Sequence, residues 1–251
     1  DLVKFEDIPM SQKRVGWDLL NQGKQALVEE AKQRFEDNVT TELTDTATGR
    51  VRGRYLYGAA DSNWNATHAT ALTNIDNTAD QLTTGMISIA KRKALIPVNA
   101  TARVRPMKVK VGKNYEEWFV FCGHTYSVRD LVDNDAAWRN AQMNLTPRMG
   151  DNVIFQGSAF KGAWNGVLVY EYDRIPLVSS TIQCAHNLML GAQAGAVVWG
   201  QRSKFGEEES DVGHDVSYEL HEIRGIKKLV FDRATQEDHG LVNVFAAAVA
   251  D

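Results

Sequence analysis

The chain has 251 residues, of which 43% are hydrophobic and 24% are charged, as in an ordinary globular protein. Its net charge of −4 provides no overall attraction to nucleic acid or to an anionic membrane. No run of about 18 apolar residues occurs, so the sequence predicts no membrane-spanning helix. The chain begins at Asp1 without an initiator methionine or a signal-like stretch, and we expect Asp1 to be an internal residue of a longer product.

The first predicted element is a long helix from Trp17 to about Phe35. This stretch contains no proline, and its apolar side chains recur at the spacing of one helix face. Those side chains are Leu20, Leu27, Ala31 and Phe35. The opposite side is expected to carry Lys24, Glu29, Gln33 and Asp37. Gly23 costs such a helix about 1 kcal/mol relative to alanine, so we expect it to permit close packing against a neighbouring element.

A long loop is predicted next, over residues 46–71, which are rich in Gly, Ala, Thr and Asn. Loops of this length in compact domains are usually functional or flexible. A second helix is predicted over residues 72–94, because apolar residues there step by three or four positions, and Pro97 marks its end. The stripe consists of Leu72, Ile75, Ala79, Leu82, Met86 and Ile89.

The remaining elements are predicted mainly as strands. Residues 103–111 and 116–122 form a predicted β-hairpin. Ser127 and Asp130 then resemble a variant capping box for a helix, which would carry Val128, Leu131, Val132 and Trp138. Residues 188–200, with small residues that allow close approach, are predicted as a buried helix. Further strands are predicted at 165–176, 214–223, 226–232 and 240–250.

Two cysteine–histidine pairs are the candidates for nucleophilic catalysis. Cys122 and His124 would lie on a strand with alpha carbons roughly 6.6 Å apart, too far for a direct hydrogen bond unless Gly123 bends the chain. Cys184 and His186 are predicted in a helix, on nearly opposite faces. We interpret both cysteines as buried small hydrophobes. A catalytic cysteine served by a distant histidine remains an alternative.

The sequence shows no other motif of catalysis, cofactor binding or metal binding. It has no phosphate-binding glycine loop, no nucleophile elbow and no His-Glu-x-x-His helix. The two cysteines provide neither a disulfide framework nor zinc-ligand spacing. The prediction is therefore no catalytic residue, no cofactor-binding residue and no metal ligand.

Charge is distributed unevenly along the chain. Eight basic residues and no acidic residue lie between Lys91 and Lys113. This stretch is either a solvated face with helix-end lysines or a positive surface facing phosphates or an acidic neighbouring subunit. Its counterpart is the acidic run at residues 206–211. With His214 the run could suggest a metal site, but it lacks the spaced ligands and glycine of a calcium loop.

A family resemblance lies in the order of several segments. They are RPMKVKVGKNYEEWFVFCGHTYSVRDL, DAAWRNAQ, DNVIFQGSAFKGAWNGVLVYEYDRIP, LMLGAQAGAVVWG and VSYELHEIRGIKKLVFD. In this order they resemble the major capsid proteins of tailed phages, and more narrowly the coat family named after coliphage N-four. The earlier MSQKRVGWDLLNQGKQALVEEAKQRF is similar to that family's entry into its long helix. The resemblance covers most of residues 10–250. One departure is Thr125, where members often have proline.

The resemblance implies the Hong Kong 97-type coat fold, an α+β shell subunit with a long spine helix. Residues 1–115 would form a peripheral domain, residues 116–205 an axial domain, and residues 206–251 would return to the peripheral domain. The implied function is a major capsid protein, not an enzyme, that assembles with itself into hexamers and pentamers of an icosahedral shell. The shell would enclose double-stranded DNA, contacted non-specifically, in the virion of a tailed bacteriophage.

The implied partners are a portal protein and scaffolding or decoration proteins, with assembly in the bacterial host cytoplasm and without a membrane or cofactor. Within this shell our hypothesis pairs the two charged segments across a subunit boundary. The residues are Lys91, Arg92 and Lys93 on one side and Glu207, Glu208 and Glu209 on the other.

Two alternative functions stay open at this point. The first is an encapsulin-like cage of the same fold that encloses a protein cargo, which cargo found with the shell would identify. The second is a Cys-dependent enzyme, for which labelling of Cys122 or Cys184 by iodoacetamide should abolish an activity.

Overall fold

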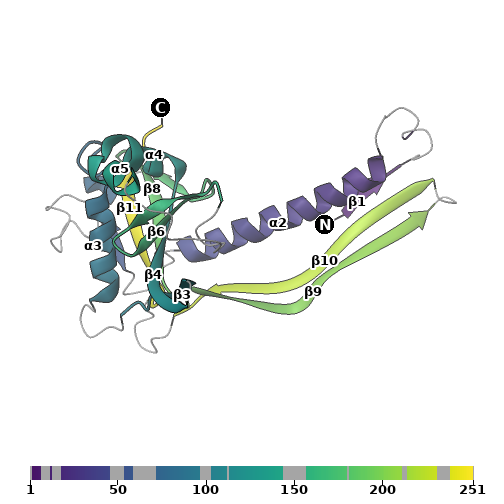
Figure 1. Ribbon diagram of the computed structural model, residues 1–251. Helices are drawn as coiled ribbons and strands as arrows, with labels where there is room; N and C mark the ends of the chain where they lie inside the picture. Colours follow the sequence, from purple (N-terminus) through teal and green to yellow (C-terminus); the bar gives the residue numbers. More distant parts are fainter. Residues whose placement is uncertain are drawn as a thin grey trace. The chain divides into compact units, whose positions relative to one another are not determined.

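The computed structural model divides the chain into two compact units (Figure 1). Unit 1 comprises residues 1–42 and 196–227, and unit 2 comprises residues 43–195 and 228–251. The structure describes residues 2–6, 12, 18–45, 54–58, 72–96, 103–111, 113–143, 157–179, 181–210, 214–230 and 238–250. Most of the loop predicted at 46–71 lies outside these residues, as do Pro97 and Gly112.

Unit 1 combines one long helix with a long β-ribbon. Its elements are β1 (Leu2–Phe5) and nearly all of α2 (Leu19–Thr44), β9 (Gly195–Ser210) and β10 (Asp215–Lys228). The last two residues of α2, the first residue of β9 and the last residue of β10 belong to unit 2. The strand order is β1-β10-β9, with β1 antiparallel to the start of β10. Leu27 of α2 packs in one cluster with Val216 and Tyr218 of β10, so the apolar side of the helix is covered by the ribbon.

The predicted long helix is confirmed, and it is longer than expected. Asp18 caps its first turn, since Asp18 Oδ1 accepts hydrogen bonds from the backbone N–H groups of Leu20 and Asn21. The helix continues past Phe35 to Thr44, because residues 36–44 contain neither proline nor glycine and β-branched residues lower helix propensity only slightly.

One position on the helix was predicted wrongly. Lys24 does not point away from the packed side: its Nζ lies 4.5 Å from the centroid of the Tyr218 ring and 3.5 Å from Glu207 Oε2. A long lysine side chain can cover apolar surface while its ammonium group stays near an acid, and here the ammonium also faces an aromatic ring.

We expect Gly23→Ala to destabilise the protein, although alanine favours helix formation. Gly23 is buried against the ring of Phe5, and an added Cβ would overlap that ring. Overpacking costs about 1–3 kcal/mol, more than the gain in helix propensity of about 1 kcal/mol. Urea unfolding of the full chain measures the effect. Gly85→Ala is the control, since a Cβ there meets only Thr83 Oγ1 at 3.5 Å. Equal gains in stability for both variants would refute the packing role of Gly23.

Unit 2 is built around one mixed sheet. Its strand order is β2-β11-β8-β4-β6-β5, with β3 added to β4 and β7 added to β8. β4 pairs with β6, and β11 with β2, in parallel, and the other pairs are antiparallel. The strands are β2 (Tyr55–Tyr57), β3 (Met107–Val111), β4 (Asn114–Gly123), β5 (Phe160–Trp164), β6 (Val167–Glu171), β7 (Leu177–Ser179), β8 (Gln183–Leu190) and β11 (Leu241–Ala247).

Helices α3 (Thr84–Leu95), α4 (Thr125–Asn134) and α5 (Ala136–Met143) supply one side of the main core. Side chains of a strand alternate between the two faces of a sheet, and β11 shows this clearly. Val242, Val244 and Ala246 join the cluster with the helices, whereas Phe245 and Ala247 join a second cluster with Cys184 of β8. The sheet is therefore buried on both faces at its centre.

Several predicted strands are confirmed. The hairpin is formed by β3 and β4, with Met107 opposite Trp118 and Val111 opposite Asn114. The strands predicted at 165–176 and 240–250 correspond to β6 and β11. The two strands predicted at 214–223 and 226–232 are one strand as far as Lys228, because Gly225 does not interrupt the ribbon.

The helix predicted over residues 72–94 is wrong in its first half. Only a short 3-10 turn (Leu72–Asn74) forms there, and α3 begins at Thr84. Asp76 Oδ1 accepts hydrogen bonds from the backbone N–H groups of Thr78 and Ala79, and such local bonds compete with a helix. Ile75, Leu82 and Met86 are nevertheless buried, so the stripe marks the core but not the secondary structure.

The helix predicted over residues 188–200 is also wrong. These residues end β8, form a turn and begin β9. β8 pairs with β11, β4 and β7, and a strand buried on both faces has the same continuous apolar sequence as a buried helix. Gly191 follows the end of β8. A glycine is needed at this position because an added Cβ would lie 2.5 Å from the carbonyl oxygen of Arg105.

The helix start predicted from the capping box is wrong, because the helix begins about one turn earlier. His124, not Ser127, is the N-cap of α4, and Trp138 belongs to α5. Ser127 and Asp130 lie inside α4, where both are buried. Thr125 is the first residue of α4, the position at which proline is also favoured.

Candidate functional site

The two cysteines are free thiols on neighbouring strands. Cys184 on β8 is fully buried, and Cys122 on β4 is half-buried. Burial raises the pKa of Cys122 to about 12 and that of Cys184 to about 11. Because the thiolate is the nucleophilic form, both groups are protonated and weakly reactive at neutral pH.

The histidines of the two cysteine–histidine pairs, His124 and His186, are held by structural hydrogen bonds. His124 Nδ1 accepts a hydrogen bond from the backbone N–H of Tyr126 at 3.2 Å, which caps α4. Burial lowers the pKa of His124, and the neutral ring is the form that can accept this bond. His186 lies on β8, two residues from Cys184 on the same face. The expected helical arrangement of that pair is therefore wrong.

Replacing either cysteine with valine should cost about 1–2 kcal/mol of stability and leave assembly intact. The physical reason is that each side chain contributes packing rather than chemistry. Urea unfolding and the yield of assembled particles check the two statements. Iodoacetamide should label the native thiols far more slowly than the unfolded ones. A variant that keeps its fold but loses a catalytic activity would contradict this interpretation.

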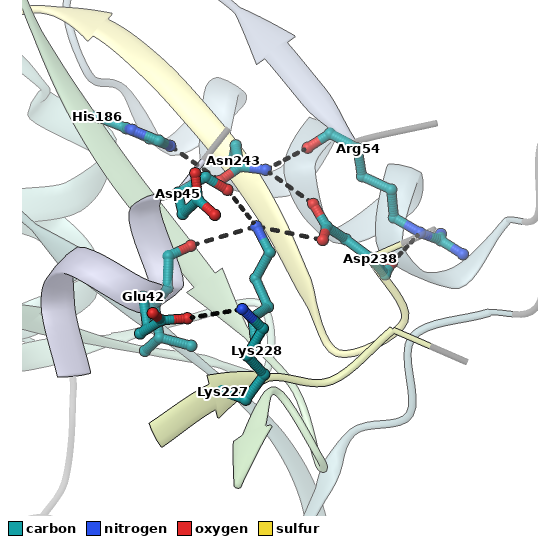
Figure 2. A network of polar contacts seen from close by, with 9 residues as sticks. Glu42, Asp45, Arg54, His186, Lys227, Lys228, Asp238 and Asn243 are labelled. Atoms are coloured by element: carbon teal, nitrogen blue, oxygen red, sulfur yellow. Dashed lines mark hydrogen bonds and ion pairs between the residues drawn. The ribbon is translucent and has the colours of Figure 1, made fainter. Parts of the chain in front are cut away.

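A buried polar cluster lies in unit 2, on the sheet face that carries His186 (Figure 2). The side chains of Lys228 and Asp238 are completely buried and form an ion pair of 3.2 Å between Nζ and Oδ1. Lys228 Nζ also donates to the carbonyl oxygens of Leu43 and Asp45, at 3.4 and 3.0 Å. The last carbonyl groups of a helix lack partners within it, so Lys228 satisfies such groups at the end of α2.

Asn243 and Arg54 extend this cluster. Asn243 Nδ2 donates to Asp238 Oδ2 at 3.4 Å and to the carbonyl oxygen of Arg54 at 3.5 Å. Its Oδ1 lies 2.8 Å from His186 Nε2, which must therefore carry the hydrogen. Arg54 donates from Nε to the carbonyl oxygen of Asp238 and from Nη1 to those of Lys93 and Ala94 at the end of α3. The cluster joins chain segments by hydrogen bonds and presents no nucleophile.

Sequence reasoning missed this cluster. The sequence pattern predicts only a strand at Lys228 and gives no signal at Asp238 or Arg54. The available signal was Asn243, the one polar residue in the apolar run from Leu241 to Ala247, because a buried amide requires partners.

The charged segments have partners within their own chain. Lys91 Nζ donates to the carbonyl oxygen of Asn165, and Lys93 Nζ to that of Tyr55. On the hairpin, Lys108 lies opposite Glu117, and opposite charges at such positions attract. Arg92 is exposed on the last turn of α3. The hypothesis that Lys91, Arg92 and Lys93 meet Glu207–Glu209 of a neighbouring subunit stays a prediction. Arg92 is the exposed member of the three basic residues.

The acidic run belongs to the exposed end of β9. Glu207 lies near Lys24 and accepts a hydrogen bond from Tyr218 Oη at 3.2 Å, and Asp211 lies outside the described residues. Among the described residues, no group of three or more histidine, cysteine or acidic side chains is arranged to hold a metal ion. In the same part of the chain, no helix is long and apolar enough to cross a membrane.

Unit 1 contains a groove of about 420 Å³ between α2 and the ribbon. Phe35 stacks on Trp199 inside it, with ring centroids 6.2 Å apart, and Arg224 lies over the Phe35 ring. The polar rim includes Glu222, which pairs with Arg224. The groove is mainly apolar and contains no arrangement of catalytic groups within the described residues.

Comparisons with known proteins agree with this picture of a structural subunit. The model of the phage capsid protein family matches residues 22–250. The capsid of cyanophage Pam1 is similar with a TM-score of 0.76 and 23% identity, over 100% of this chain and 74% of that chain. The capsid of Ralstonia phage GP4 gives a TM-score of 0.75 and 20% identity, over 100% and 74%. No curated protein matches the chain.

A third solved structure shows the same likeness at a lower sequence identity. The head of Helicobacter pylori bacteriophage KHP40 gives a TM-score of 0.69 at 12% identity, over 99% of this chain and 73% of that chain. At these identities the structures show a shared fold, the mixed helix-and-strand fold of Hong Kong 97-like capsid subunits. Because the family model matches nearly the whole chain, this protein belongs to the phage capsid protein family and is a major capsid protein, a repeated subunit of the virion shell.

Proposed function

We propose that the protein forms hexamers and pentamers of an icosahedral shell that encloses the double-stranded DNA of a tailed phage. The family match over residues 22–250 carries this proposal. The arrangement of the segments supports membership of the coliphage N-four type of coat family. A shell subunit acts through contacts with its neighbours, so a catalytic role is not part of the proposal.

The two units suggest a revised division into domains. We assign the peripheral role to unit 1, because it contains the long helix α2 that resembles the spine helix. The axial role falls to unit 2. This proposal replaces the expected domain boundaries at residues 115 and 205 with those of the two units. The reason is that α3, β3 and β11, which were expected in the peripheral domain, pack in or on the sheet of unit 2. Electron microscopy of an assembled shell would place each unit relative to the symmetry axes.

Partners other than copies of this chain are also part of the proposal. Portal, scaffolding or decoration proteins would join the shell during assembly in the host cytoplasm. The packaged DNA would contact the shell non-specifically, because a net charge of −4 gives little general attraction to phosphates. Tight binding of phosphates by the inner wall would also oppose packaging and ejection.

Assembly of the purified full-length protein tests this function. We expect hexamers, pentamers or closed particles, with a yield that depends on salt, because exposed ion pairs between subunits are individually weak and screened. Electron microscopy and sedimentation at several salt concentrations provide the measurement. Particles filled with a protein cargo would favour the encapsulin-like alternative. A monodisperse monomer at every salt and protein concentration would refute the proposal.

A further inference from the structure

The outer edge of β9 is an unusual surface for a strand of this length. In the described sheet of unit 1 β9 has one neighbour, β10, and its other edge is unpaired. β9 extends over 16 residues, none of which is buried. A long, unpaired edge can pair with a strand from another chain, and β9 contains no proline to prevent this.

The charges along β9 are arranged with opposite signs on the two sides of Phe205. Arg202 and Lys204 precede it, and Glu207, Glu208 and Glu209 follow it. If two copies of β9 pair antiparallel with Phe205 at the centre, Arg202 lies opposite Glu208 of the second copy, and Glu208 lies opposite its Arg202. Parallel pairing in register would place like charges side by side, which is unfavourable. The strand is therefore complementary in charge to an inverted copy of itself.

The two faces of β9 agree with this register. Trp199 and Phe205 turn toward the packed side, where they stack on Phe35 and Tyr218. Side chains alternate along a strand, so Arg202 and Glu208 share the opposite face. Both are exposed, and neither has an ion-pair partner in the described part of its own chain. Their charges are thus available to a second copy without breaking a contact within the first.

We propose that β9 is a self-association edge of this capsid protein, at which β9 of one copy pairs antiparallel with β9 of a second copy about a two-fold axis through Phe205. The occupant is a second copy because a two-fold contact uses the same surface on both partners and the charge pattern of β9 is self-complementary. This inference rests on the proposed function, since it names one contact by which the shell assembles.

Charge reversal provides the first test. Arg202→Glu and Glu208→Arg, each alone, should weaken association of the full chain by about ten-fold or more, because each creates two like-charge pairs per contact. The double variant restores opposite charges and should return association to within about three-fold of the original. Glu29→Arg, on the exposed side of α2, is a matched control that should leave association unchanged. Failure of the double variant to recover would overturn the proposed pairing.

Disulfide cross-linking provides the second test. Residues 202 and 208 are roughly 20 Å apart along one strand, too far for a disulfide within a copy. Arg202→Cys combined with Glu208→Cys should therefore give cross-linked dimers on mild oxidation of assembled particles. Arg202→Cys with Glu209→Cys is the control, because those side chains fall on opposite faces in this register and should not link. Particles that assemble without any 202–208 cross-link would overturn this inference and leave the shell function standing, whereas a chain that never assembles would overturn both.

Discussion

Lys228→Met should destabilise the protein by about 3–5 kcal/mol, the cost of leaving one charge of a buried ion pair without its partner. Methionine has a similar length and fills the space, so the effect reports the charge rather than a cavity. Asp238 would be left buried beside Asn243, and the carbonyl oxygens of Leu43 and Asp45 would lose their shared donor. Urea unfolding of the unassembled subunit measures the loss.

Two further variants separate the buried pair from charge in general. Lys227→Met removes the neighbouring lysine, whose side chain is 71% exposed and pairs with Glu42 at 3.7 Å, and it should cost less than about 1 kcal/mol. Lys228→Met combined with Asp238→Asn removes both charges and should recover much of the loss, because a neutral amide is cheaper to bury than an unpaired carboxylate. If Lys228→Met lowers the free energy of unfolding no more than Lys227→Met does, the buried ion pair between Lys228 and Asp238 does not stabilise the protein.

Local pattern predicted the elements whose structure depends mainly on neighbours in sequence. The apolar face of α2 was read correctly from Leu20, Leu27 and Phe35, and the β3–β4 hairpin from its alternation. The predictions failed where tertiary packing decides. β8 has the composition of a buried helix, yet it is a central strand because β11 and β4 supply its hydrogen-bond partners on both sides.

The polar cluster could not be predicted because its members are distant in sequence. Arg54 and Asp238 are separated by 184 positions, and no spacing rule connects them. Asn243 alone gave a signal, and a buried amide does not reveal its partners. The shell function, in contrast, followed from the order of many segments rather than from a site. A structural subunit distributes its function over its surface, so no single motif identifies it.

The stability of the unassembled subunit should fall as pH decreases from about 6.5 toward 4, and His186 should be a major cause. Burial lowers the pKa of His186 from 6.5 to about 4. Between these values the unfolded chain binds a proton that the folded chain does not, so unfolding is favoured by acid. The loss by pH 4 should be about 3 kcal/mol. Above pH 6.5 the ring is neutral in both states, and its contribution is fully present.

Burial keeps the ring of His186 neutral in the folded state, because the ring lies on the buried sheet face and stacks on Phe245 with centroids 4.4 Å apart. Its hydrogen bond from Nε2–H to Asn243 Oδ1 acts in the opposite direction and raises the pKa of His186, but less than burial lowers it. The nearby charges oppose each other, since Lys228 lowers the pKa of His186 and Asp238 raises it. Burial therefore dominates, and a protonated ring would have to be accommodated on the buried face of the sheet.

His186→Gln tests this explanation, because glutamine can donate to Asn243 but does not titrate. The urea midpoint of the variant should change less between pH 7 and pH 4.5 than that of the original chain. His124, whose pKa is also lowered by burial, should leave a smaller residual slope in the same direction. An unchanged slope in His186→Gln would mean that other groups, foremost His124, set the acid sensitivity.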